Sequence, residues 1–468
     1  MNRLVEIPTN FNPSLTISNN GGTLFTDSGL VVLKLFMEHI HFSTLASQLL
    51  HFKDFRKHFK HSNVNILEQL IFQLAAGYST DSAADYLNKD QVFSVIPNHL
   101  VASQPTISRF FKQIDEQTIK DFSTLNLALL NRFEPLRNSS ELIIDVDSTH
   151  FDTYGQQEGT ASNAHYGTTG YHPLVAFDGL TGDFLSAELR PGNVYTSTNV
   201  AKFLSPLLSH YHQPTLDKTI LVRGDSGFAT PEIYELCEQQ DANYVIRLKS
   251  NRALGKLAEG YIKIDDDMDW TTDETYYYST TYQAASWTKP RRICIKSVRR
   301  PNELIFEHTY IVTTLSDNVN AQTVFSIYQK RGQMENYIKE AKNGFFMGKT
   351  DSLGFIENFG RLWISALTYN LVNLMKRFCL EPKNQTMQVN SLRLKLFKFA
   401  GKLVKTGRRL YLKMSTSHVY QKIFYRLITK ISLLARNIKK WVSPRDKSAH
   451  NWLNTCNMSY MRVKKDKN

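Results

Sequence analysis

Three acidic residues stand where the chain could present them to a metal ion. Asp147 closes a run of β-branched and apolar residues, Asp225 follows a second such run, and Glu335 lies among good helix formers. Carboxylate oxygens are the ligands that Mg²⁺ prefers in proteins. A pair of such ions can activate an attacking oxygen and stabilise a leaving oxygen in phosphodiester transfer. The three acids therefore predict a site for metal-dependent phosphoryl transfer, and no His/Cys zinc spacing or Walker-type loop competes with it.

The first acid of this set has two candidates. Asp145 and Asp147 are two residues apart, so their side chains point to the same side of one strand. We prefer Asp147 because it lies nearer the open strand end. Asp145 remains a structural acid or a possible additional metal ligand. Two further acids, Asp178 and Asp183, flank glycines and are interpreted as turn residues.

The glutamate lies in a segment, residues 328–342, that reads as one helix opened by Tyr328. At about 100° per residue, the stripe that begins with this tyrosine also holds Arg331, Glu335 and Lys342, at about −60°, −20° and −40°. Glu340 falls about 140° from Glu335 and should face elsewhere. A carboxylate beside two cations and a phenol suits a polyanion gripped next to a metal. The same stripe is also compatible with a solvated helix face that carries ordinary ion pairs.

The elements that must position these residues follow from changes in hydrophobic period. From about residue 30 to 133, apolar residues recur at the helical interval. From residue 141, apolar runs bounded by polar residues predict strands, with a hairpin near 171–190 and helices between later strands. The order strand, strand, strand, helix, strand, helix, strand is that of a ribonuclease-H-like α/β core. In such a core the first and fourth strands are neighbours, so Asp147 and Asp225 would emerge at the same edge.

This pattern divides the chain into five parts. A helical region that we expect to bind DNA, 1–135, precedes the first piece of the catalytic core, 136–250. Alternating residues predict an inserted small β domain over 251–309. The second piece of the core, 310–375, carries the glutamate helix, and a basic helical region, 376–468, follows.

The charge of the chain is concentrated in its last part. The net charge of the 468 residues is +13, yet residues 376–468 hold 23 Lys/Arg against 3 Asp/Glu. The remaining residues hold 33 Lys/Arg against 40 Asp/Glu. Aromatic and aliphatic residues are interleaved with the C-terminal cations, a pattern that favours nucleic-acid binding. The alternative is a solvated, lysine-rich helical tail.

A second DNA-binding element is predicted within the N-terminal helices. In the segment 103–112, Ser103 could cap a helix whose outward residues are Gln104, Thr106 and Arg109. A helix of this kind can enter a major groove. An ordinary capped core helix is the alternative.

Composition also bounds the class of protein. Apolar stretches are interrupted well short of a membrane span, and the first residues lack the layout of a signal peptide. The cysteines, at positions 237, 294, 379 and 456, are far apart and expected to be reduced. We therefore expect a soluble cytoplasmic protein.

Three blocks give the sequence a family resemblance. They are Asp145-Val-Asp147-Ser-Thr, then Arg223-Gly-Asp225-Ser-Gly-Phe, and a Tyr-x2-Arg-x3-Glu-x6-Lys signature that runs from Tyr328 to Lys342. Over roughly residues 63–377 the chain resembles DDE transposases of bacterial insertion sequences, and details resemble the insertion-sequence 1380 family. The resemblance implies a ribonuclease-H-like core interrupted by a β domain. It also implies cut-and-paste transposition at inverted terminal repeats by a homodimer on DNA, in a bacterial cytoplasm near the nucleoid.

The resemblance further implies roles for individual residues. Asp147, Asp225 and Glu335 would bind Mg²⁺, with two ions expected and Mn²⁺ as a substitute. Contacts to DNA phosphates near the cleaved end are implied for three signature residues, Tyr328, Arg331 and Lys342. An aromatic residue of the β insertion would stack on a flipped base, for which Trp270 and Trp287 are the candidates. Burial in a small β core is the alternative for each tryptophan.

Two other functions compete with transposition. A structure-selective nuclease would keep the fold and cut branched DNA without regard to inverted repeats. A non-catalytic regulator would bind DNA through a disabled core, although the presence of all three acids argues against it.

Overall fold

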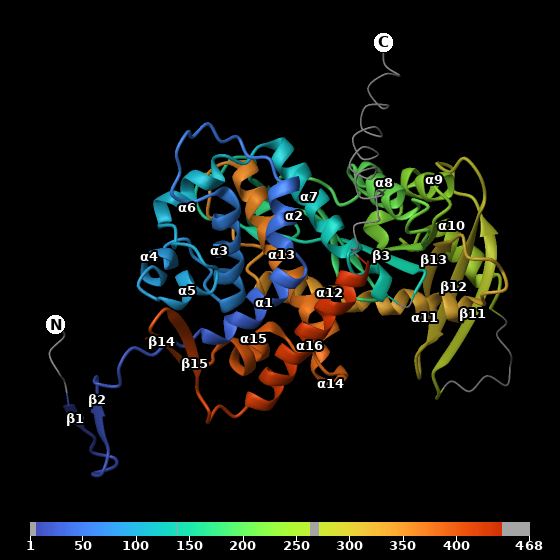
Figure 1. Ribbon diagram of the computed structural model, residues 1–468. Coiled ribbons are helices and arrows are strands. Elements are labelled where there is room, and N and C mark those ends of the chain that lie inside the picture. The colour runs from blue at the N-terminus through green and yellow to red at the C-terminus, as the bar shows by residue number, and fades with distance from the viewer. Residues whose placement is uncertain (1–5, 138, 263–270, 442–468) are drawn as a thin grey trace.

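A mixed sheet of eight strands runs from the middle of the molecule to its right-hand end in Figure 1. The computed structural model describes residues 6–137, 139–262 and 271–441, the last seven by their backbone alone. From one edge of the sheet to the other, the strands are β11 (Glu274–Tyr282), β12 (Arg291–Arg299), β13 (Glu307–Thr313), β10 (Asn243–Leu248), β9 (Thr219–Gly224), β3 (Glu141–Ser148), β7 (Leu174–Asp178) and β8 (Phe184–Glu188). Strand β9 runs parallel to both of its neighbours, β10 and β3. The strands that lead to Asp147 and Asp225 are therefore adjacent and point the same way.

The segment predicted as an inserted β domain joins this sheet. Strand β12 pairs with β11 on one side and with β13 on the other, and β13 continues onto β10. Strands β11 and β12 therefore extend one edge of the eight-stranded sheet and do not form a separate sheet. A short helix, α10 (Arg252–Glu259), precedes them.

Helices cover both faces of the sheet. On one face lie α8 (Val200–Tyr211) and α9 (Pro231–Gln239), where Tyr234 stacks on Tyr244 of β10 with ring centroids 5.2 Å apart. On the other face lies α11 (Ala321–Gln329), whose Val324 and Phe325 pack against Val245 of β10. Alternation along β10 thus sends successive side chains into two different apolar layers, as expected for a strand covered on both sides.

Helices also form a large body beside the sheet (Figure 1). The buried helix α13 (Phe355–Cys379) runs through it and contacts α3, α7, α16 and β8. Its middle part is buried almost all round, as expected for a helix enclosed by others, and it includes buried polar residues such as Asn370. The surrounding helices are α1 (Val31–His39), α2 (Phe42–Leu49), α3 (Asn63–Ala76), α4 (Ala83–Leu87), α5 (Val92–Val95), α6 (Gln104–Phe111), α7 (Glu116–Asn131), α14 (Pro382–Gln385), α15 (Val389–Leu392) and α16 (Gln421–Trp441).

In the described ranges, no single helix is long and apolar enough to cross a membrane, although the bent pair Ser28–His39 and Phe42–Leu49 reaches that threshold by length and composition. The described cysteines, Cys237, Cys294 and Cys379, are buried and form no disulfide, and Cys456 lies outside the described residues.

The segment predicted as one helix over 328–342 is helical throughout, but it is not one regular α-helix. Helix α11 ends at Gln329, a 3₁₀ turn covers Lys330–Gly332, α12 spans Gln333–Lys339, and a π-helical turn covers Glu340–Gly344. Gly332 lowers the α-helix propensity at the 3₁₀ turn. The constant 100° step assumed from the sequence therefore fails across this segment, and its side chains must be placed from their contacts.

The C-terminal region is also not purely helical. Strands β14 (Gly401–Thr406) and β15 (Arg409–Met414) form a hairpin. Its two-residue turn begins with Gly407 at φ +59°, a conformation that glycine adopts at little cost. Three shorter elements elsewhere are strands as well: β4 (Phe151–Asp152), β5 (Ala161–Asn163) and β6 (Thr168–Tyr171) form a small sheet after β3. A further hairpin, β1 (Glu6–Pro8) with β2 (Thr16–Ser18), extends away from the body (Figure 1).

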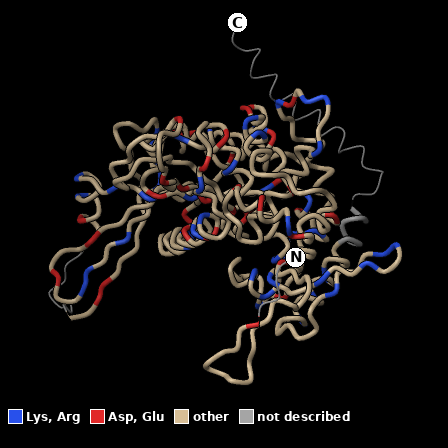
Figure 2. The backbone as a smooth tube through the Cα atoms, turned by 90° about the vertical axis from the view of Figure 1, so that its left-hand side faces the viewer, with Lys and Arg blue, Asp and Glu red and all other residues tan. Residues whose placement is uncertain are grey.

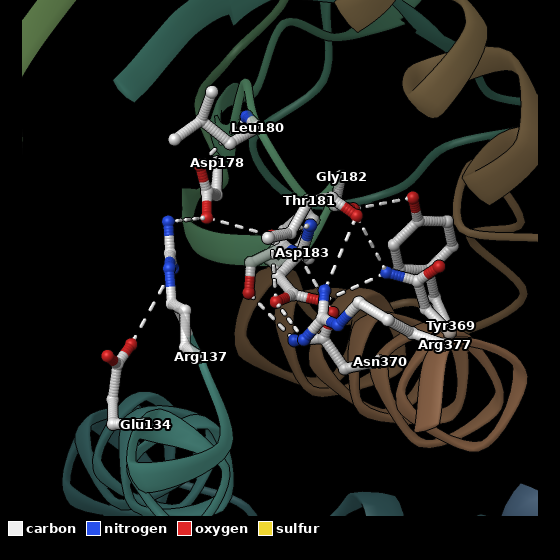
Figure 3. A network of polar contacts seen from close by, with 12 residues as sticks. Glu134, Arg137, Asp178, Leu180, Thr181, Gly182, Asp183, Tyr369, Asn370 and Arg377 are labelled. Carbon is white, nitrogen blue, oxygen red and sulfur yellow. Dashed lines mark hydrogen bonds and ion pairs between the residues drawn. The ribbon is translucent and has the colours of Figure 1, made fainter. Parts of the chain in front are cut away.

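Polar contacts fasten the β7–β8 turn to the helical body (Figure 3). Arg137 bonds to Asp178 at 2.7 Å, and Arg377 of α13 bonds to Asp183 at 2.7 Å. Both aspartates are buried turn residues in this network. Next to it, the fully buried Asn370 accepts a hydrogen bond from the Phe184 amide at 2.8 Å. The central sheet is thus locked to α13 through side-chain to backbone bonds.

Replacing Asn370 tests this lock. Asn370→Ala removes the acceptor of the buried Phe184 amide and should lower the free energy of unfolding by about 2–4 kcal/mol. Urea denaturation measures the change. Asn336→Ala, an exposed residue of α12, is the matched control and should alter stability by less than about 0.5 kcal/mol. Equal losses in both variants would contradict the role assigned to Asn370.

Candidate catalytic site

The site is built around Asp147 near the end of β3. The Nη2 atom of Arg331 donates to Oδ2 of Asp147 at 2.8 Å, and the Ser148 amide donates to Oδ1 at 2.9 Å. The side chains of Asp147 and Arg331 are only 17% and 10% exposed. The 3₁₀ turn after α11 therefore brings the guanidinium of Arg331 to Asp147. The family resemblance implies a contact of Arg331 with a DNA phosphate, which stays a prediction.

The second and third acids lie close enough to affect Asp147. Burial, together with the charges of Asp225 and Glu335, raises the pKa of Asp147 to about 6 against the opposing effect of Arg331. Asp225 caps the turn after β9, where its Oδ1 accepts from the Gly227 amide at 2.8 Å. Glu335 is exposed on α12. Asp147 and Asp225 therefore lie at the ends of the adjacent strands β3 and β9, and the charge of Glu335 acts on Asp147.

The alternative first acid is engaged elsewhere. Both oxygens of Asp145 accept hydrogen bonds from Arg223, each at 2.6 Å, and both side chains are buried. Arg223 also donates to the Ile327 carbonyl at 2.7 Å. A Cβ at Gly179 would lie 2.5 Å from this guanidinium, so the pair needs glycine there. This geometry favours Asp147 over Asp145 as the acid that faces a substrate.

Comparison with known proteins identifies the family. A family model described as transposase DDE domain group 1 matches residues 7–436. The chain belongs to this family. Its general activity is that of a DNA transposase, and DDE transposases generally use divalent metals. No curated protein matches the chain.

Solved structures resemble the transposase only distantly. A piggyBac transposase synaptic complex with hairpin DNA shares 12% identity, with 84% of this chain and 82% of that chain covered and a TM-score of 0.40. A Mos1 transposase paired-end complex with left transposon end shares 13% identity, with 41% and 61% covered and a TM-score of 0.16.

The acids suit a divalent cation by their chemistry. All three are hard oxygen donors, and the mutual repulsion that helps to raise the pKa of Asp147 is what a bound cation would relieve. Within the described ranges, no three His, Cys, Asp or Glu side chains are close enough to share one ion in this conformation. Arg331 instead supplies the positive charge next to Asp147. An ion shared by the three acids would therefore require side-chain movement, and Glu335 is exposed on α12.

The other two residues of the signature, Tyr328 and Lys342, lie near the ends of β3 and β9. Tyr328 is half-buried, and burial together with the charges of Asp225 and Asp147 raises its pKa. Lys342 donates from Nζ to the His150 carbonyl at 2.6 Å. The lysine thus holds the backbone just after β3, and the predicted contact of Lys342 with a DNA phosphate stays a prediction. Glu340 is predicted from the sequence to face away from Glu335. It accepts a hydrogen bond from the Val389 amide at 2.5 Å.

Further residues near the acids were not predicted. Lys249 donates to the hydroxyl of Tyr195 at 3.0 Å, and its pKa is raised chiefly by this tyrosine, with a contribution from Asp225. Tyr166 is 44% exposed and stacks on His150 with ring centroids 4.8 Å apart. Burial and the charges of Asp147 and Asp225 raise the pKa of Tyr166. Lys249 follows β10, the strand next to β9, so its approach to Asp225 could have been inferred from strand order.

Two further residues predicted to contact DNA, Arg109 and Trp287, are described by the structure, and neither contacts the three acids. Arg109 is exposed on α6 in the helical body, and Ile107 on the same helix is buried. Trp287 is buried against Tyr234 and Tyr282, with ring centroids 5.5 Å apart in each pair. This burial is the alternative that the sequence left open for Trp287. Trp270 lies outside the described residues.

The raised pKa of Asp147 gives a pH-dependent prediction. The folded protein holds this proton more tightly than the unfolded chain, so stability contributed at low pH is lost as pH rises from about 4 through about 6. The difference in unfolding free energy between wild type and Asp147→Asn should therefore fall by roughly 2–3 kcal/mol between pH 4 and pH 8. Urea denaturation in EDTA at intermediate pH values measures it. A pH-independent difference would contradict the assignment.

Asp145 predicts a different outcome, because its role is structural. Asp145→Ala leaves the buried Arg223 unpaired and should cost about 3–5 kcal/mol. Asp145→Ala combined with Arg223→Ala should cost much less than the sum of the single changes, since no buried charge then lacks a partner. Asp152→Ala, at an exposed acid on β4, is the control. Additive losses in the double variant would refute this pairing.

Proposed function

We propose that this transposase cuts DNA at the inverted terminal repeats of its element and joins the freed ends to target DNA. The observation that carries the proposal is the proximity of Asp147 and Asp225, at the ends of the adjacent strands β3 and β9, to Glu335 and to the buried cation Arg331. Such a site combines metal ligands with a group that can receive phosphate. The fold that supports it is, on this proposal, a ribonuclease-H-like core whose edge is lengthened by β12 and β11.

The metal-binding residues are Asp147, Asp225 and Glu335. Two Mg²⁺ ions, or Mn²⁺ in their place, would supply the positive charge that favours attack on a phosphodiester and departure of its 3′-oxygen. Asp225 is held by the Gly227 amide, so its carboxylate keeps one orientation. Glu335 is exposed and completes the set by moving toward the strand edge.

The cations and phenols around the acids position the DNA. Arg331 forms an ion pair with Asp147 and can turn one of its remaining donors to a phosphate oxygen. Tyr328 presents its hydroxyl group beside Arg331. Lys342 fixes the backbone at His150, which keeps the end of β3 in place. Lys249, exposed and next to Asp225, is a further phosphate contact on this proposal.

The DNA partners are the two ends of the element and the target. Bringing two ends together requires two active sites, so we propose that a homodimer assembles on DNA. The exposed face of α6, with Arg109, is proposed to contribute to duplex binding.

Glu335→Gln tests the assignment. The change keeps size and removes the charge, so cleavage in Mg²⁺ should fall by roughly a thousandfold or more, and binding to terminal-repeat DNA should change by less than about threefold. Gel analysis of cut products and a binding titration give the two values. Glu232→Gln, at an exposed acid that opens α9, is the matched control and should cut like wild type.

The choice of DNA separates the competing functions. Duplexes that carry the repeats that flank the coding region are compared with scrambled ends. Cuts at the repeat boundary alone support transposition. Equal cutting of scrambled or branched DNA would establish a structure-selective nuclease instead, and full cleavage by Glu335→Gln would sink the metal-site assignment.

A further inference from the structure

The hairpin β14–β15 is the most strongly cationic projection of the described chain. Its fourteen residues, 401–414, include five Lys/Arg and no Asp or Glu. All five of these cations are exposed. Figure 2 shows the hairpin standing out from the right-hand side of the body, with Lys and Arg along it.

The register of the hairpin sorts its side chains onto two faces. Directly opposed residues share a face, and successive residues along a strand alternate. Lys402 lies opposite Lys413, Val404 opposite Tyr411, and Thr406 opposite Arg409. The cationic face therefore consists of Lys402, Val404, Thr406, Arg409, Tyr411 and Lys413. The opposite face consists mainly of Leu403, Lys405, Leu410 and Leu412.

The cationic face lacks compensation within the described residues. Lys402 and Lys413 oppose each other directly, an arrangement of like charges that destabilises a strand pair. No acidic side chain in the described ranges forms an ion pair with either lysine or with Arg409. Lys398, at the root of the hairpin, by contrast bonds to the buried Asp27 at 2.6 Å. The face thus carries a repulsion that a polyanion would relieve.

The hairpin is held firmly at its root. The Phe25 amide donates to the Gly401 carbonyl at 2.8 Å, and the Gly401 amide donates back to Phe25 at 2.9 Å. A Cβ at Gly401 would meet Ser28 Oγ at 2.6 Å, so the close approach needs glycine. The ribbon is therefore anchored to the N-terminal helices while its outer part stays free.

We propose that the cationic face of β14–β15 binds the phosphate backbone of duplex DNA. A two-stranded ribbon fits the major groove, and its cations would reach the phosphates at the groove edge. Arg409 and Lys413 are four residues apart on one strand, so they span about 13 Å, or roughly four base-pair steps. Tyr411, 43% exposed between them, adds a hydroxyl donor. The proposal rests on the proposed function only in taking DNA as the substrate.

Removing the three cations of this face tests the proposal. Lys402→Ala, Arg409→Ala and Lys413→Ala combined should weaken binding to terminal-repeat and scrambled duplexes alike, because phosphate contacts carry no sequence information. The slope of log Kd against log salt concentration should fall by roughly 2 to 3, at about 0.9 per lost phosphate contact. Fluorescence anisotropy between about 50 and 200 mM salt measures both values.

Two controls guard the result against charge and folding effects. Lys89→Ala, Lys202→Ala and Lys256→Ala combined remove equal charge at exposed positions elsewhere and should leave the slope within about 1 of wild type. K413E places a carboxylate opposite Lys402, so it should preserve or raise the thermal midpoint and yet weaken DNA binding at least tenfold. A purely structural hairpin would show no loss of binding in that stabilised variant.

The outcomes separate the two proposals. A wild-type chain that fails to bind any duplex overturns the proposed function. Wild-type binding and cleavage, with an unchanged affinity and salt slope in the triple variant, overturns the role of the hairpin alone. Loss of binding only for terminal-repeat DNA also contradicts it, because that result requires readout of base sequence.

Discussion

The buried ion pair between Asp145 and Arg223 is the constraint on which the site depends. It joins β3 to β9 at equivalent positions of two parallel strands, so the residues two further along, Asp147 and Asp225, reach the same edge. Arg223 also bonds to the Ile327 carbonyl and thereby holds the end of α11 against the sheet. The turn that follows delivers Arg331 to Asp147. One guanidinium thus sets the register of the strands and the position of the helix that carries Glu335.

The site that results keeps like charges close together, which opposes folding and favours cation binding. Desolvation and neighbouring carboxylates both raise the pKa of Asp147, and Arg331 only partly offsets them. A cation bound among the acids would remove this cost and would free the guanidinium for another anion. On the proposal above, Arg331 would first pair with Asp147 and would then contact a DNA phosphate once a cation is bound.

The parts of the fold that sequence could predict are those encoded locally. Apolar runs that end in Asp147 and Asp225 identify buried strands, and their adjacency follows from the element order. Gly332 marks a weak point in the helix after α11, but the change to a 3₁₀ turn could not be foreseen, because the contacts of Arg223 and Arg331 are long-range. The sequence predicts a helix over the hairpin β14–β15, because leucines and cations suit both structures, although Gly407 marks its turn. Pairing of β12 with β13, and of β13 with β10, likewise merges two regions that looked separate in sequence.

The separation of charges across the chain explains why a transposase needs surfaces beyond its acids. The candidate site holds the carboxylates of Asp147, Asp225 and Glu335, which repel a polyanion until cations neutralise them. Arg331 and Lys249 reduce that repulsion locally, but their own charges are partly used by Asp147 and Tyr195. The uncompensated cations of β14–β15 have no such partner among the described residues, and their root is bonded to the segment that leads into the N-terminal helices. On the proposals above, affinity for DNA resides in the helical body, apart from the acids at the ends of β3 and β9.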